Sequence, residues 1–203
     1  MKRFIAVVLC LLMIAAVLTG CGSKNQETQN PVVTIKLSGG EVIKMELYPD
    51  VAPNTVKNFI YLINEGFYNG LTFHNVKENL CVMAGDPDGN CNGGPGYTIE
   101  GEFIKNGFEN TLSHTAGTVS MARRSSGYDT AGSQFFIMTN DVPELDGFYA
   151  AFGSVIEGME VVDAISELET DENGKPTDEI TIKKMTVDTF GIDYEKPEVI
   201  EEN

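Results

Sequence analysis

Short stretches in which apolar and polar residues alternate fill most of the chain between Pro31 and Gly191. The first two cover residues 32–37 and 42–47, with Ser-Gly-Gly between them, which predicts a β-hairpin. Short apolar runs broken by Gly, Pro or Asn follow, and they have the sequences LTFHNV, LCVMAG, GTVSMA, SQFFIMT and YAAFGSVI. A last alternating stretch, EITIKKMTVDTF, predicts a strand that closes the domain.

Two segments have a helical rather than an alternating pattern. In PDVAPNTVKNFIYLINEG, apolar residues recur at helical spacing, Asn54 is the expected N-terminal cap and Gly66 the stop. Residues 157–169 form the second expected amphipathic helix. Many short strands with only two helices predict an all-β fold, an antiparallel barrel or sandwich whose open ends the helices could cover.

The N-terminus has the features of a secretion signal. Lys2 and Arg3 precede an apolar run, residues 4–18, that is shorter than a membrane-spanning helix, and Leu-Thr-Gly-Cys21 follows. This ending resembles the lipobox of bacterial lipoproteins, in which the cysteine becomes the first residue and carries lipid. We expect residues 1–20 to be a signal peptide and lipid on Cys21 to anchor the protein at the extracytoplasmic face of the cell membrane. An ordinary cleaved signal and a short anchor helix are the alternatives.

The folded domain is expected to cover residues 31–191, with a polar segment on each side. Residues 21–30 have nothing to bury and predict a flexible tether from the lipidated cysteine. Residues 192–203 are acidic and without periodicity, which predicts a solvated tail.

Composition excludes several functions. A formal charge of −16 argues against nucleic acid and against anionic lipid headgroups as partners, so membrane contact would have to come from the lipid. The sequence DPDGNCNGG fails as a calcium loop, because its sixth position is Cys91 and its twelfth is Tyr97. Because the chain has no CxxC pair, we expect neither a dithiol redox centre nor a zinc ribbon.

Few residues are available for other chemistry. The two histidines, His74 and His114, are expected to make ordinary structural hydrogen bonds. Cys81 and Cys91 are the other thiols of the mature domain. Outside the cytoplasm they could form a disulfide, and free buried thiols are the alternative.

Taken together, the blocks TFHNV...AGDP, GGPGYTIEGEF, LSHTAGTVSMA, AGSQFFIMT and LDGFYAAFGSVIEGMEVVDAI resemble the cyclophilin family of peptidyl-prolyl isomerases. Their order and spacing match over residues 31–191. The resemblance implies an eight-stranded antiparallel β-barrel capped by two α-helices. It also implies isomerisation of X-Pro bonds in unfolded or extended polypeptides, without a cofactor or a metal.

Such a site has to lower a rotation barrier of ~18–20 kcal/mol, which arises from amide resonance. An apolar pocket holds the proline ring, and a donor to the proline nitrogen weakens the resonance as that nitrogen turns pyramidal. The resemblance assigns Phe136 as the pocket floor, Gln134 and Ala122 as groove residues, and Leu145 as a wall. A polar amide such as Gln134 needs partners, which a bound peptide backbone would supply.

The family's donor is an arginine that follows the Phe-His pair, and here that position is Asn75. The resemblance places His74, Phe136 and Gln134 with Asn75 in the catalytic group. Further departures fall on pocket positions: Leu80 replaces a phenylalanine, Cys81 a methionine, Met83 a glutamine and Tyr149 a histidine. Loss of a charged hydrogen bond worth ~1.5–3 kcal/mol predicts turnover that is roughly 10- to 150-fold slower.

Arg123 and Arg124, on the loop after Ala122, are candidates for bringing a cation back to the groove. Three functions therefore remain open. The first is a lipid-anchored isomerase that helps secreted proteins to fold, weakened by Asn75. The second is a non-catalytic proline-peptide binding or holdase module, and the third is a structural lipoprotein.

Overall fold

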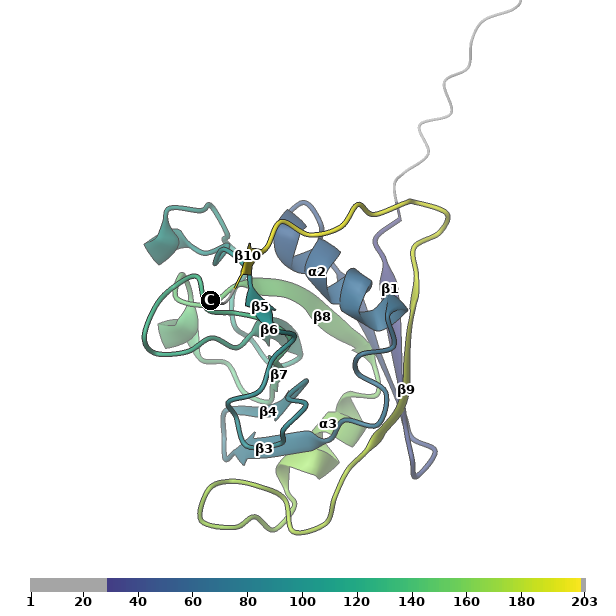
Figure 1. Ribbon diagram of the computed structural model, residues 1–203. Helices are drawn as coiled ribbons and strands as arrows, with labels where there is room; N and C mark the ends of the chain where they lie inside the picture. Colours follow the sequence, from purple (N-terminus) through teal and green to yellow (C-terminus); the bar gives the residue numbers. More distant parts are fainter. Residues whose placement is uncertain (1–28, 202–203) are drawn as a thin grey trace, which may run out of the picture.

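The computed structural model describes residues 29–201, and most of its strands form one antiparallel sheet (Figure 1). The order across this eight-stranded sheet is β3-β4-β7-β6-β8-β2-β1-β9. Its strands are β1 (Val32–Leu37), β2 (Val42–Leu47), β3 (Phe73–Lys77), β4 (Cys81–Ala84), β6 (Thr118–Met121), β7 (Phe135–Met138), β8 (Ala151–Glu157) and β9 (Ile182–Asp188). The antiparallel eight-stranded arrangement confirms the predicted fold class. Within residues 29–201, no helix is long and apolar enough to cross a membrane.

The predicted hairpin is formed by β1 and β2, with Ile35 opposite Ile43. Alternate residues of both strands are buried, and the residues between them face outward to some degree. This burial pattern is the one that the alternation in the sequence predicts.

The two outer strands of the sheet approach each other, so the sheet curls round. Thr72, just before β3, forms an antiparallel bridge with Thr181, just before β9. The Phe73 N–H donates to the carbonyl oxygen of Ile180 at 2.9 Å, and the Ile182 N–H donates to that of Leu71 at 2.8 Å. These bonds satisfy backbone groups that an open sheet edge would expose.

Residues 29–201 contain two α-helices, as predicted, but their ends differ from the prediction. They are α2 (Pro53–Asn64) and α3 (Met159–Ser166), and two short 3₁₀ helices, η1 (Ile104–Asn106) and η2 (Pro143–Leu145), lie in the loops. The second helix begins two residues later than expected because Glu157 ends β8 and Gly158 makes the turn with φ 88°.

The prediction that Asn54 caps α2 is wrong. Asn54 lies inside the helix, after Pro53, and no side chain of the helix start caps it. The carboxylate of Glu102, only 4% exposed, instead accepts the N–H groups of Asn54 and Thr55 at 2.9 and 2.7 Å. A buried carboxylate at this end also interacts favourably with the helix dipole.

The core lies between α2 and the sheet and contains four contacting aromatic rings. The Phe59 ring, from α2, is 5.0–5.1 Å from the rings of Tyr68, Phe135 and Phe152. All four side chains are fully buried. The helix is therefore held by packing against β8 and against β7, whose other face carries the candidate site.

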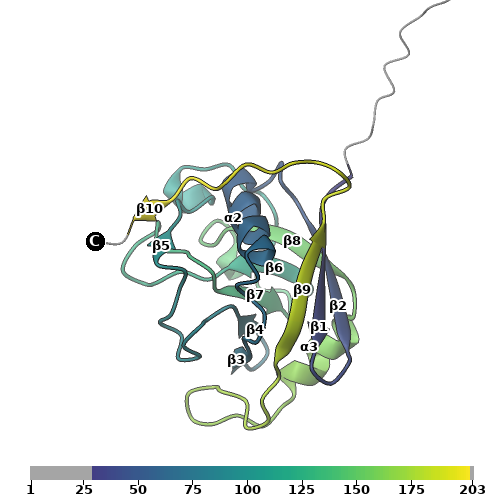
Figure 2. The ribbon, with the colours of Figure 1, turned by 45° about the vertical axis from the view of Figure 1, so that its right-hand side comes forward.

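The described part of the predicted solvated tail is mostly exposed, as expected, but it is tied to the domain. After β9 the chain passes over one end of α2 and ends in β10 (Ile200–Glu201), which pairs with β5 (Tyr97–Thr98) (Figure 2). The side-chain amide of Asn54 donates to the Glu198 carbonyl at 2.9 Å and accepts from the Glu198 N–H at 2.8 Å. We call residues 192–201 the C-terminal strap. The expected signal peptide, Cys21 and nearly all of the tether lie outside the described residues.

Candidate functional site

Four neighbouring strands bring the predicted site residues into one row. Asn75 on β3 lies opposite Met83 on β4, Met83 lies opposite Phe136 on β7, and Phe136 lies opposite Ser120 on β6. Residues directly opposite each other in an antiparallel pair project from the same face of a sheet. The arginine position and the predicted pocket floor therefore share one face, separated by Met83.

On this face a second hydrophobic cluster forms, distinct from the core. Its buried members are Cys81, Phe136 and Met138, and its half-buried members are Leu80, Met83, Ala122, Val142, Leu145 and Tyr149. Seven of the residues that the resemblance assigns to the substrate pocket thus come together, from segments far apart in the chain. We call this group the Phe136 cluster.

Phe136 forms the base of this cluster rather than an open surface. Its side chain is 4% exposed. The Tyr149 ring lies edge-on to it, with centroids 5.6 Å apart, and the His114 ring is stacked at 6.0 Å. Leu145, on η2, packs against the same group.

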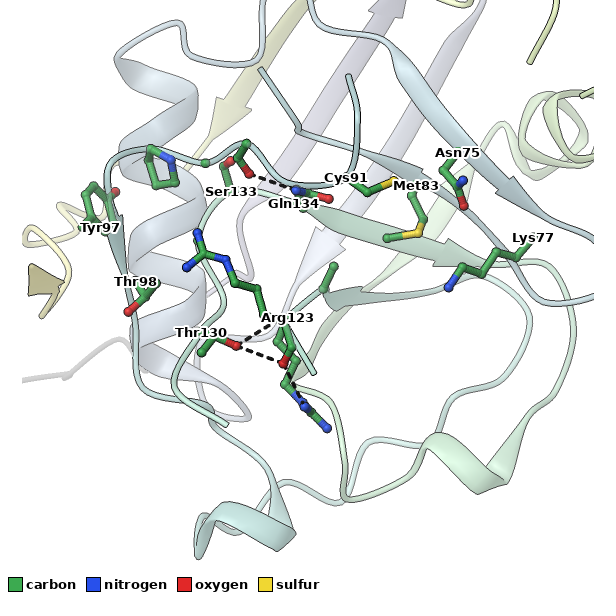
Figure 3. Close-up of a pocket in the computed structure, with 16 residues that line it drawn as sticks. Asn75, Lys77, Met83, Cys91, Tyr97, Thr98, Arg123, Thr130, Ser133 and Gln134 are labelled. Carbon is green, nitrogen blue, oxygen red and sulfur yellow. Dashed lines mark hydrogen bonds between the residues drawn. The ribbon is translucent and has the colours of Figure 1, made fainter. Parts of the chain in front are cut away.

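An open cleft of about 240 Å³ adjoins the cluster (Figure 3). Met83 and Ala122 belong to both, so the cleft and the cluster are continuous. The other lining residues are Asn75, Lys77, Cys91, Gly93, Gly94, Pro95, Tyr97, Thr98, Arg123, Arg124, Thr130, Gly132, Ser133 and Gln134. Lys77, Cys91 and the glycine-rich loop up to Thr98 are lining residues that the sequence analysis missed.

Gln134 lies beside the cleft, immediately before β7, but part of its hydrogen-bonding capacity is used within the protein. Its side-chain Nε2 donates to the Gly93 carbonyl oxygen at 2.9 Å, a bond drawn in Figure 3. Gly93 therefore supplies one of the partners that Gln134 was expected to find in a bound peptide. The bond fixes the loop that forms one wall of the cleft against β7.

Asn75 lines the cleft, yet its amide nitrogen is directed to another partner. The side chain is 6% exposed, and Nδ2 donates to the carbonyl oxygen of Asn173 at 2.7 Å. The adjacent Val76 N–H donates to the Gly174 carbonyl at 2.7 Å, so two bonds tie β3 to this loop. The Asn75 Oδ1 atom is buried without a partner among the described residues. At the arginine position, one N–H of a short side-chain amide is thus used by the fold, and the amide nitrogen is held beside Asn173.

Arg123 lines the cleft with its guanidinium held in place. Its Nε donates to the Phe148 carbonyl at 3.0 Å, and one terminal nitrogen donates to the Gly127 carbonyl at 3.3 Å. The guanidinium carbon also lies 4.8 Å from the centroid of the Tyr149 ring. Arg123 therefore braces the loop beside the Phe136 cluster, which does not support its predicted role as a mobile cation.

His74 does not lie in the cleft, so its position does not support a catalytic role. It falls at an irregularity in the β3–β4 register and is 2% exposed. The Gln134 side chain and the Thr72 backbone are its hydrogen-bonding neighbours, although neither ring nitrogen has a partner of good geometry among the described residues. Burial lowers the pKa of His74, and the nearby Asp86 carboxylate opposes this shift.

His114, by contrast, makes the structural hydrogen bonds that the sequence analysis expects. Its Nδ1 lies 2.9 Å from a carboxylate oxygen of Asp146, and its Nε2 lies 3.0 Å from the Ser120 hydroxyl. Burial lowers the pKa of His114, although Asp146 acts in the opposite direction. The ring is therefore neutral at pH 7, with Nδ1–H donating to Asp146 and Nε2 accepting from Ser120. This arrangement holds the ring that stacks on Phe136.

Cys81 and Cys91 are both free thiols in the described domain, and Cys81 alone matches the alternative of a free buried thiol. Cys81 is buried in the Phe136 cluster and Cys91 is exposed on the cleft. Burial raises the pKa of the Cys81 thiol to about 11. Within residues 29–201, no three His, Cys, Asp or Glu side chains come together as metal ligands would.

Over residues 29–201, the fold and the site define a protein with an eight-stranded, curled antiparallel sheet, two α-helices and a cleft on one face of the sheet. Comparison with known proteins identifies its family. The family model for cyclophilin type peptidyl-prolyl cis-trans isomerase/CLD matches residues 32–187. Peptidyl-prolyl cis-trans isomerase B of Bacillus subtilis is 48% identical over 124 residues, which are 61% of this chain and 82% of that protein. A peptidyl-prolyl cis-trans isomerase of Helicobacter pylori is 43% identical over 136 residues, or 66% and 79% of the two chains.

A solved structure agrees with the sequence comparison. A cyclophilin type isomerase of Cryptosporidium parvum, crystallised in the presence of the dipeptide Ala-Pro, has a TM-score of 0.69 and 32% identity. The match covers 85% of this chain and 99% of that one. The chain belongs to the cyclophilin-type peptidyl-prolyl cis-trans isomerase family. It is thus an enzyme that interconverts the cis and trans forms of X-Pro bonds.

Proposed function

We propose that this isomerase is anchored by lipid on Cys21 at the outer face of the cell membrane and acts on secreted chains as they fold. The support is the basic start, the short apolar run and the Leu-Thr-Gly-Cys21 ending of the N-terminus. Uncatalysed X-Pro isomerisation takes tens to hundreds of seconds, so even a modest catalyst would be useful to a folding protein.

The substrate proline is proposed to sit on the Phe136 cluster, with the preceding residues in the cleft beside Gln134. The observation that carries this placement is the continuity of the two, since Met83 and Ala122 belong to both. An apolar cluster with an aromatic base suits a pyrrolidine ring, and the adjoining polar cleft suits a peptide backbone. The dipeptide Ala-Pro used with the Cryptosporidium protein is consistent with this chemistry.

Within this site, Asn75 is proposed to lower the rate. Its amide nitrogen bonds to Asn173, so it does not stabilise the proline nitrogen in the transition state. Binding of the substrate in its ground state depends on the Phe136 cluster and the cleft. This binding therefore survives the loss of the arginine's charged hydrogen bond. The same observation favours the second candidate function, a proline-peptide binding or holdase module with little rate enhancement.

A turnover assay on a short Xaa-Pro peptide, combined with a direct binding measurement, tests the proposal. We expect the wild type to bind and to accelerate isomerisation, and Phe136→Ala to lose both. Phe190→Ala, which removes an exposed phenylalanine outside the cleft, is the matched control. Because the loss of Phe136 could unfold the domain, Ala122→Phe, which fills the junction of cluster and cleft, should block binding while circular dichroism stays unchanged. A wild type that binds the peptide but does not accelerate its isomerisation would reject the catalytic proposal and support the holdase module.

Anchoring is tested separately. We expect the wild type to fractionate with membranes and to incorporate labelled palmitate, and Cys21→Ser to do neither. Labelling that persists in Cys21→Ser, or a wild type that carries no label, would reject the lipid anchor without affecting the proposed substrate site.

A further inference from the structure

The charges around the cleft are opposite to those of the chain as a whole. The chain has 30 acidic and 14 basic side chains. Among the described residues that line the cleft, three are basic, namely Lys77, Arg123 and Arg124, and none is acidic. The described lining of the cleft is therefore basic, and its charge acts on whatever occupies the cleft.

Of these three cations, Lys77 is the one whose charged group is not used by the fold. The Arg123 guanidinium is held by carbonyl oxygens and aromatic rings. Arg124 also lines the cleft, and its backbone N–H donates to the Thr130 hydroxyl oxygen at 2.9 Å. The exposed Lys77 ammonium makes no ion pair and no hydrogen bond with any residue in the range 29–201.

The position of Lys77 places this ammonium within reach of the proposed proline site. Lys77 follows Asn75 by two residues on β3, so both side chains project from the face that carries Phe136. Figure 3 shows Asn75 and Lys77 together at one end of the cleft, next to Met83. Lys77 is displaced along β3 by about 7 Å from the row of Asn75, and β3 and β7 are about 10 Å apart, since only β4 separates them. The flexible four-carbon stem of Lys77 extends further toward β7 than the short amide of Asn75 does, and a proline ring seated on Phe136 would cover part of the remaining distance.

We propose that Lys77 supplies the cationic donor that position 75 lacks. The ammonium would hydrogen-bond to the proline nitrogen as it turns pyramidal, and no covalent bond is made or broken and no proton is transferred. This inference rests on the proposed seat of the proline ring on the Phe136 cluster. A single flexible ammonium is less preorganised than a planar guanidinium, so turnover remains below that of a well-placed arginine.

The test compares Lys77→Met, Lys77→Arg and the wild type in turnover and in peptide binding. For Lys77→Met we expect kcat to fall by about 10- to 150-fold, the effect of one charged hydrogen bond, with little change in KM or in the measured Kd. Lys77→Arg should retain most of the rate, since it keeps a cation on a long side chain. Lys183→Met, on the exposed side of β9, is the matched control and should change nothing.

Two peptides separate transition-state stabilisation from simple charge recognition. One has alanine and the other glutamate before the proline. The proposal expects the same loss of kcat in Lys77→Met with both peptides. A loss confined to the glutamate peptide, or one that appears only in KM, would overturn it, because Lys77 would then bind a substrate side chain.

The failures of the two proposals are distinguishable. Unchanged turnover in Lys77→Met with an active wild type overturns the role of Lys77 and leaves the proposed site intact. A wild type whose turnover does not depend on Phe136 or Ala122 overturns the proposed site itself.

Discussion

Asn75→Arg is the substitution that tests most directly how this site compensates for its missing guanidinium. In the wild type, Asn75 Nδ2 donates to the Asn173 carbonyl at 2.7 Å. The substitution removes this bond, and water can reach the exposed Asn173 loop in its place. We expect unfolding stability to fall by about 0.5–1.5 kcal/mol, the ordinary net value of one hydrogen bond.

The gain in turnover depends on what Lys77 already provides. A guanidinium at position 75 contributes ~1.5–3 kcal/mol as a charged hydrogen bond, equivalent to roughly 10- to 150-fold in kcat/KM. In the Lys77→Met background we expect this full gain. In the wild-type background the gain in kcat/KM should be smaller, because the ammonium of Lys77 and the new guanidinium then act on the same proline nitrogen. The coupling energy between positions 75 and 77 should be about 1 kcal/mol or more.

The assay is a double-mutant cycle of kcat/KM for the wild type, both single variants and the double variant on one neutral Xaa-Pro peptide. Denaturation by urea gives the stability of each protein, so that loss of folded enzyme is not counted as loss of catalysis. Equal gains from Asn75→Arg in the two backgrounds would show independent effects and refute the reasoning. A gain absent from both backgrounds would show that position 75 does not reach the proline nitrogen.

Three further predictions concern the fold around the site. Burial lowers the pKa of both His74 and His114 from 6.5, so the unfolded chain binds protons more readily than the folded one. Urea unfolding should therefore show a stability that is intact above about pH 6.5 and declines as the pH falls below it. A stability that does not change with pH in this range would contradict the prediction. Removing residues 192–203 should lower stability by about 1–3 kcal/mol by thermal or urea unfolding, because the strap's bonds to α2 and β5 are lost. Glu102→Gln should cost about 1–3 kcal/mol by the same measurement, since a neutral amide replaces a carboxylate that accepts two N–H groups at the start of α2, and an unchanged midpoint would exclude this cap.

Local patterns in the sequence predict the elements whose contacts are local. The β1–β2 hairpin needs only alternation and a Ser-Gly-Gly turn, and α2 needs only helical spacing. The cap of α2 is Glu102, which is far from it in sequence, so no rule based on neighbouring residues could identify it. The strap was missed for the same reason, because the partners of residues 198–201 lie on α2 and β5.

In the site, too, the sequence predicts some features, whereas others depend on contacts between distant segments. The resemblance identifies Phe136 and its neighbours as pocket residues, and the structure groups them in one cluster. The relation of Asn75 to Phe136 depends on the register of three strands, which the sequence does not supply. Lys77 could have been found from alternation on β3, since it lies two residues after Asn75, but the family pattern directs attention to the altered positions alone.

The core and the cleft are linked through one buried residue of α2. Asn58 is fully buried, accepts a hydrogen bond from the Tyr97 hydroxyl at 2.8 Å and donates to the Gly132 carbonyl at 2.8 Å. Both partners line the cleft. The same helix is held at its start by Glu102 and by the strap, which also pairs with Tyr97 through β10. The wall opposite Lys77 is therefore fixed by contacts outside the cleft, whereas the Lys77 ammonium is free to follow the substrate.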